Sequence, residues 1–80
     1  MAQLIPPLCR AARGLLDWTQ EDLAKAAGVC RSTIRDFEKG HHALQRGSEQ
    51  AVMNALQGAG VSFLFEPTGP GVALRTQSPP

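Results

Sequence analysis

The chain has 80 residues, of which 42% are hydrophobic and 19% are charged, and its formal net charge is +1. These values are typical of an ordinary globular domain. The apolar runs are too short to cross a bilayer, which excludes a transmembrane protein. The N-terminus has no secretory signal, and two cysteines, Cys9 and Cys30, are too few for a disulfide framework, so we expect a cytoplasmic protein.

A first helix is expected after Pro6 and Pro7, because the missing amide donors of proline cost nothing at a helix start. Apolar residues then recur at the spacing of one helical face: Leu8, Ala11, Ala12, Leu15 and Leu16. Residues 1–5, before the prolines, are expected to be loose. Trp18 follows this helix, where it can pack as a hydrophobic staple against the next one.

A second helix is predicted to begin at Thr19, which stands at an N-cap position. Asp22, three residues later, completes a capping-box pattern. Apolar residues follow at helical spacing, namely Leu23, Ala24 and Ala27, before Gly28 breaks the run. The small side chain of Ala24 would allow a second helix to cross this one at a steep angle.

A third helix is predicted to begin near Cys30 and to end at Gly40. Ile34 and Phe37 give it a buried stripe. Two short helices joined by a glycine turn are typical of a motif that places its second helix in the major groove of DNA. The charges fit this motif in part, because Arg31, Arg35, Lys39 and Arg46 gather after the turn.

A fourth helix is predicted to begin at Ser48, after a loop over residues 41–47, and to end at Gly60. Its apolar face would consist of Val52, Ala55, Leu56 and Ala59.

Residues 61–66 then alternate as a strand, residues 67–71 are typical of a turn-forming loop, and residues 72–75 form a plausible return strand. A small single core gains from a partner subunit, and an isolated hairpin is marginally stable. We therefore expect the hairpin to pack against the helices and against a second copy of the chain. The expected dimer interface consists of Phe63, Leu64, Phe65, Val72 and Leu74.

The string CRAARGLLDWTQEDLAKAAGVCRSTIRDFEKG resembles the Cro/C1-type (XRE-like) helix-turn-helix regulators. The positions that match the motif are Gln20, Ala24, Gly28, Ile34 and Phe37. We therefore expect a mainly α fold, a four-helix lambda-repressor-like helix-turn-helix domain over residues 4–60 with a C-terminal β-hairpin over residues 61–75. Residues 76–80 are expected to be a disordered tail.

The outer start of the third helix provides the candidates for contacts with DNA bases, namely Arg31, Ser32, Arg35 and Asp36. An arginine can donate two parallel hydrogen bonds to guanine O6 and N7, so Arg31 should set the strongest sequence preference. Arg35, one turn later, could reach a base or the adjacent phosphate. Asp36 could accept from a cytosine N4, or it could instead hold an arginine in place.

The amino end of the second helix has free backbone donors and the positive end of the helix dipole. The resemblance implies that Thr19 and Gln20 contact a backbone phosphate there. Further candidates for phosphate contacts are Thr33, His41, His42 and Arg46, and such contacts set register without selecting sequence. The resemblance also implies a semi-buried structural ion pair between Arg13 and Glu38.

Several residues have a simpler interpretation beside a functional one. Cys30 replaces the serine usual in this family and is better explained as a tolerated small side chain than as a redox switch. His41 and His42 have no other ligands at zinc spacing, so no metal or cofactor is expected. Nothing resembles a nucleophile beside a base, so we do not expect an enzyme.

These features predict a homodimeric, sequence-specific transcriptional regulator that binds an inverted-repeat DNA operator and blocks or recruits polymerase. The alternative is a protein-interaction module, antitoxin-like or anti-regulator, which binds a second regulatory protein and contacts DNA only secondarily. The near-neutral charge and Asp36 favour that alternative, whereas Arg31, Arg35 and Gln20 favour DNA. A purely architectural DNA binder, indifferent to sequence, is a further possibility.

Overall fold

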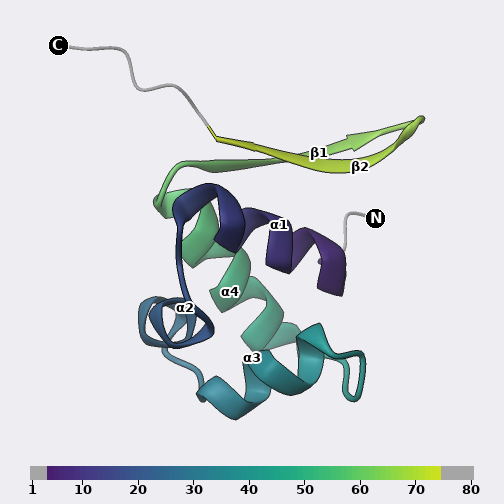
Figure 1. Cartoon of the computed structure of the whole chain (residues 1–80). Coiled ribbons are helices and arrows are strands. Elements are labelled where there is room, and N and C mark those ends of the chain that lie inside the picture. The colour runs from purple at the N-terminus through teal and green to yellow at the C-terminus, as the bar shows by residue number, and fades with distance from the viewer. Residues whose placement is uncertain (1–3, 75–80) are drawn as a thin grey trace, which may run out of the picture.

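Four helices and one β-hairpin make up residues 4–74, which are the residues that the computed structural model describes. The elements are α1 (Pro6–Leu16), α2 (Gln20–Ala27), α3 (Arg31–Glu38), α4 (Arg46–Gly58), β1 (Val61–Glu66) and β2 (Gly69–Leu74) (Figure 1). The expected mainly α fold with a C-terminal hairpin is therefore confirmed. Arg75 and the predicted tail at 76–80 lie outside the described residues.

Capping interactions mark the end of α1 and the start of α2. Pro6 and Pro7 occupy the first two positions of α1, and Asp17 ends it with a left-handed φ of 57°. The Thr19 hydroxyl then accepts the Asp22 N–H at 3.0 Å, and the Asp22 carboxylate accepts the Thr19 N–H at 2.9 Å. This reciprocal pair, which also lowers the pKa of Asp22, confirms the predicted capping box at the start of α2.

Gly28 turns the chain between α2 and α3. Its φ of 72° lies in the region that side chains disfavour, and its N–H and that of Val29 both donate to the Ala24 carbonyl, at 2.9 and 3.0 Å. α3 begins directly afterwards, with Cys30 at an N-cap that makes no side-chain hydrogen bond. The turn therefore brings α3 back against α2 with only three residues between them.

The core draws apolar side chains from all four helices, from β1 and from the segment before α1. Its buried members are Leu4, Leu8, Cys9, Ala12, Leu23, Ala24, Ile34, Phe37, Val52, Leu56 and Val61. The expectation that residues 4 and 5 are loose was wrong, because Leu4 is only 2% exposed and Ile5 packs against the core.

The buried face of α1 is also rotated from its predicted position. Cys9 is completely buried, whereas Ala11 is exposed and Leu15 is 41% exposed. The reason is that α1 is covered from two directions, by α3 and by the hairpin. Its buried stripe therefore runs along Leu8, Cys9 and Ala12.

α4 begins at Arg46, two residues earlier than the predicted start at Ser48. The Glu49 N–H donates to the Gln45 carbonyl at 2.8 Å and closes a first turn that contains Gly47, a residue of the predicted loop over 41–47. The Glu49 carboxylate in turn accepts the Leu4 N–H at 3.0 Å. This hydrogen bond ties the chain before α1 to the start of α4.

β1 and β2 pair antiparallel from Val61 opposite Leu74 to Glu66 opposite Gly69. The turn between them is only Pro67 and Thr68, so the predicted loop over residues 67–71 was too long. The hairpin packs on α1 and α4, as expected, with Val61 buried. In Figure 1 it lies at the end of the domain opposite α3.

The buried position of Leu4 gives a prediction on stability. Leu4→Ala removes a core side chain that is 2% exposed, and should lower the free energy of unfolding by about 2–5 kcal/mol. Leu15→Ala, at a position 41% exposed, is the matched control and should change it by less than about 1 kcal/mol. Urea denaturation followed by circular dichroism measures both, and equal stabilities would contradict the burial of Leu4.

Candidate nucleic-acid interface

A buried carboxylate joins the first three helices. Glu38, at the end of α3, has a side chain only 2% exposed and lies against Arg13 of α1. Arg13 donates from Nε to Glu38 Oε2 at 2.8 Å and from Nη2 to Oε1 at 2.6 Å. This two-point geometry is the strong form of an arginine–carboxylate pair. Arg13 Nη1 also donates to the Trp18 carbonyl at 3.0 Å, which fixes the chain just before α2.

Further donors complete the surroundings of Glu38. Cys9 Sγ donates to Oε2 at 3.0 Å, and Gln20 Nε2 donates to Oε1 at 3.1 Å. Arg10 donates to the backbone carbonyl of Glu38, at the negative end of the α3 dipole. Every one of these contacts joins α1 or the start of α2 to the C-terminal end of α3.

Burial and hydrogen bonding shift the pKa values of Glu38, Arg13 and Cys9 in this cluster. Burial raises the pKa of the Glu38 carboxyl, but the hydrogen bonds from Arg13, Cys9 and Gln20 outweigh it and hold the pKa below its ordinary value. The hydrogen bond with Glu38 raises the pKa of Arg13. Burial, followed by the contact with Glu38, raises the pKa of the Cys9 thiol, so Cys9 remains a protonated donor.

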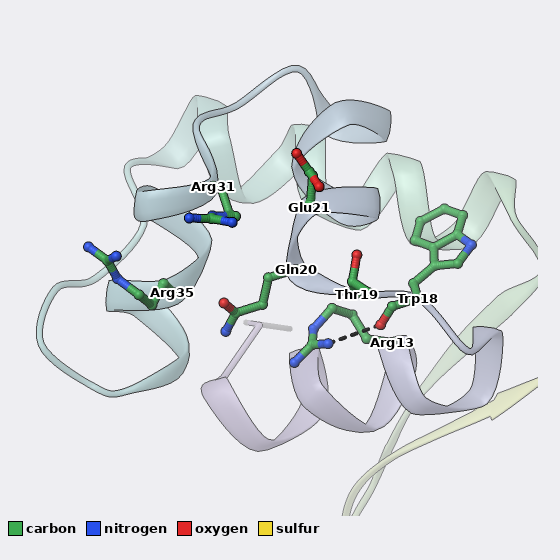
Figure 2. Close-up of a pocket in the computed structure, with 7 residues that line it drawn as sticks. All are labelled: Arg13, Trp18, Thr19, Gln20, Glu21, Arg31 and Arg35. Atoms are coloured by element: carbon green, nitrogen blue, oxygen red, sulfur yellow. Dashed lines mark hydrogen bonds between the residues drawn. The ribbon is translucent and has the colours of Figure 1, made fainter.

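An open cleft lies between the start of α2 and the start of α3 (Figure 2). Its lining consists of Arg13, Trp18, Thr19, Gln20, Glu21, Arg31 and Arg35. Figure 2 shows Arg31 and Arg35 projecting from α3 on one side, with Gln20 extending toward them from α2. Since the charge of Arg13 is neutralised by Glu38, the cationic groups facing solvent here are Arg31 and Arg35.

The polar groups at the start of α2 differ in how much of their hydrogen-bonding capacity is already used within the protein. Gln20 is held by Glu38, so one amide hydrogen is used while the rest of the amide faces the cleft. The Thr19 oxygen accepts the Asp22 N–H, which leaves its hydroxyl hydrogen to donate. Glu21 also lines the cleft, on the side of Arg31 in Figure 2, and brings a negative charge that sequence reasoning did not place there.

A second cleft lies on another side of α3, against the loop that leads to α4. It brings together Ser32, Thr33, Asp36, His42, Ala43, Leu44, Gln45 and Ser48. Asp36 also lies beside its neighbour, with Arg35 Nε 3.4 Å from Asp36 Oδ1. His41 and Arg46 are exposed and line neither of these two clefts. The other candidate DNA contacts divide into two sets around α3.

The residues that sequence reasoning missed are structural supports of this surface. Neither Cys9 nor Arg10 was among the predicted site residues, yet both contact Glu38. The one available indication was their spacing, since Cys9, Arg10 and Arg13 fall within four positions of one another on α1. Cys30 is exposed at the N-cap of α3, consistent with a tolerated small side chain.

The sequence model of the helix-turn-helix family matches residues 10–46, which run from α1 to the first residue of α4. This segment is a Cro/C1-type helix-turn-helix domain. The match supports a DNA-binding helix-turn-helix regulator. A comparison with curated proteins finds no matching relative of the chain.

Within residues 4–74, His, Cys, Asp and Glu side chains do not gather in any group of three or more that could hold a metal ion. No helix in the same range has the length and apolar character needed to span a membrane.

The isolation of Glu38 from water predicts a large loss of stability when it is removed. Glu38→Ala should lower the free energy of unfolding by about 3–5 kcal/mol, because the Arg13 guanidinium loses its buried partner. Glu21→Ala is the matched control: its exposed side chain supports only the α2 dipole, so it should cost less than about 1 kcal/mol. Thermal melts of both variants test this, and a Glu38→Ala protein as stable as wild type would refute the structural role.

The pKa of Glu38 also predicts a pH dependence. Its folded-state value lies below the ordinary one, so its contribution to stability is fully present above about pH 4.3 and is lost as the pH falls further. Glu38→Gln lacks this ionisation, so the stability gap between wild type and Glu38→Gln should narrow on acidification. Urea titrations from pH 7 to pH 3.5 measure the gap, and a constant gap would contradict the prediction.

Proposed function

We propose that the protein is a sequence-specific transcriptional regulator that binds an inverted-repeat DNA operator as a homodimer, with α3 in the major groove. The observation that carries the proposal is the cleft of Figure 2, where Arg31 and Arg35 of α3 lie beside the polar start of α2. Two exposed guanidinium groups next to a helix N-terminus suit a surface that faces both base edges and phosphates.

Base selection is assigned to the exposed start of α3. Arg31 and Ser32 are exposed and precede the buried Ile34, so they point away from the core. Arg31 would donate to guanine O6 and N7, and Ser32 would contribute a weaker preference. Arg35 would contact a base or the next phosphate. Asp36, beside Arg35, would either orient that guanidinium or accept from a cytosine.

Phosphate contacts are assigned to both sides of α3. Thr19 and Gln20 line the first cleft, and Thr33 and His42 line the second, so the two DNA strands that border a major groove could each be held. His41 and Arg46, both exposed near the second cleft in sequence, would extend that contact. With a net charge of +1, the protein should bind unrelated DNA only modestly.

A homodimer is proposed because one helix contacts only a few base pairs. A two-fold dimer would present its two α3 helices about 34 Å apart, one DNA turn. The interface is assigned to the hairpin, which carries exposed apolar side chains in Leu64, Phe65 and Leu74 and lies opposite α3 (Figure 1). Phe63 and Val72, which are partly buried against the core, would pack between this interface and the helices.

The second candidate function is a protein-interaction module, antitoxin-like or anti-regulator, in which DNA binding is secondary. Glu21 at the first cleft and Asp36 at the second favour it, because carboxylates beside phosphate are unfavourable. A gel shift with the DNA upstream of the protein's own gene separates the two candidates. Retention of that DNA by the Arg31→Ala, Gln20→Ala double variant would count against the assigned contacts.

Arg31 gives the sharpest prediction on specificity. Selection of bound sequences from a random pool should yield an inverted repeat with a fixed half-site spacing. Arg31→Ala should then weaken binding to that site by about 1–3 kcal/mol and remove the preference for guanine at one position of each half-site.

Lys25→Ala is the control for Arg31→Ala, because it removes the same charge from an exposed residue that lines neither cleft. It should leave the selected sequence unchanged. If the two variants select the same sequences as wild type, Arg31 does not contact a base. Binding that is indifferent to sequence in wild type would instead indicate an architectural DNA binder.

A further inference from the structure

The two outer edges of the β-hairpin are not equivalent. In residues 4–74 the sheet consists of β1 and β2 alone, so each strand has one row of backbone groups that faces no other strand. Pro70 of β2 lies opposite Phe65, and a proline nitrogen has no hydrogen to donate. Proline fits a strand only where that nitrogen faces away from the neighbouring strand, so the outer edge of β2 lacks a donor at this position.

The outer edge of β1 has no such block. Residues 61–65 contain neither proline nor glycine nor a charged side chain, whereas natural sheet edges are commonly protected by proline or charge. Leu64 is 41% exposed and Phe65 is 44% exposed. β1 therefore offers both unpaired backbone groups and uncovered apolar side chains.

The apolar inner face of β1 also continues beyond its own helices. Val61, Phe63 and Phe65 alternate onto one face, and their exposure increases along the strand, from 1% at Val61, through the partly buried Phe63, to 44% at Phe65. Figure 1 shows the cause, since the tip of the hairpin extends past the N-terminal start of α1. Phe65 stacks on Phe63 at a centroid distance of 6.4 Å, so it extends the same apolar surface.

We propose that β1 pairs antiparallel with β1 of a second copy of this chain, which makes a four-stranded sheet in the order β2-β1-β1-β2. A two-fold axis normal to the sheet, near Phe63 and Leu64, sets the strand against itself in this way. Residues on the same face then lie opposite one another. Phe65 of one protomer comes to lie beside Val61 or Phe63 of its partner, where the partner's helices cover it.

The geometry favours a second copy over an unrelated partner. An axis normal to the sheet leaves both helical bodies on the same side of it. Since α3 lies at the end of the domain opposite the hairpin, the two α3 helices then point away from the sheet in the same direction (Figure 1). That arrangement is what two half-sites on one face of DNA require. The inference rests on the homodimer proposed above and narrows its interface from the whole hairpin to β1, so that Leu74 of β2 lies outside the interface.

Sedimentation of two matched variants in the absence of DNA tests whether the dimer forms through the outer edge of β1. Phe65→Ser changes β1 and Leu74→Ser changes β2, at positions 44% and 49% exposed, and circular dichroism checks that both remain folded. The wild type and Leu74→Ser should be dimers at micromolar concentration. Phe65→Ser should raise the dimer dissociation constant at least about tenfold. A monomeric wild type, or a Leu74→Ser protein that dissociates as readily as Phe65→Ser, would overturn the proposal.

A disulfide cross-link tests the register independently. Leu64→Cys, in a Cys30→Ser background that removes the exposed native thiol, places a thiol next to the two-fold axis. Oxidation should join two chains, whereas Leu74→Cys in the same background should not. A monomer that still binds its operator would overturn the strand pairing and leave the DNA-binding function intact. A β1-paired dimer that binds no DNA would uphold the pairing and overturn the regulator.

Discussion

The burial of one carboxylate determines how the binding surface is built. Glu38 is inaccessible to water, so its charge must be balanced inside the protein, and Arg13, Cys9 and Gln20 supply four donor atoms to it. These donors come from α1 and from the first residue of α2. Satisfying Glu38 therefore fixes both helices against the end of α3. The other face of α3, with Arg31 at its start and Arg35 in its last turn, is left facing solvent.

The molecule has two chemically different ends. At one end, the polar starts of α2 and α3 form an open cleft beside exposed guanidinium groups. At the other, an apolar hairpin rests on α1 and projects beyond it (Figure 1). α1 lies between them and contacts both, through Arg13 on one side and its packing against β2 on the other. A dimer formed through the hairpin would leave the cleft unobstructed.

The strong local patterns in the sequence were sufficient to predict most of the fold. The Thr19 capping box, the Gly28 turn and the alternation of Val61, Phe63 and Phe65 are each decided by neighbouring residues. The failures have a common cause in contacts between distant segments. Leu4 is buried in the core and its N–H donates to Glu49, and α4 begins early despite Gly47. Pro70 joins β2 because its nitrogen faces outward.

In the candidate site, too, local patterns could be predicted from the sequence and contacts between distant segments could not. The exposed residues of α3 follow from helical periodicity, but the engagement of Gln20 by Glu38 and the presence of Glu21 in the cleft depend on tertiary packing. The sequence therefore identifies the residues able to contact DNA, whereas the three-dimensional structure determines which of them are already held.

Amide chemical shifts of the isotope-labelled protein would report whether the exposed start of α3 contacts DNA. On titration with a duplex selected from a random pool, the largest changes should occur at Arg31, Ser32 and the start of α2, while the hairpin amides remain unchanged. Changes confined to the hairpin, with Arg31 and Ser32 unaffected at saturation, would contradict the account.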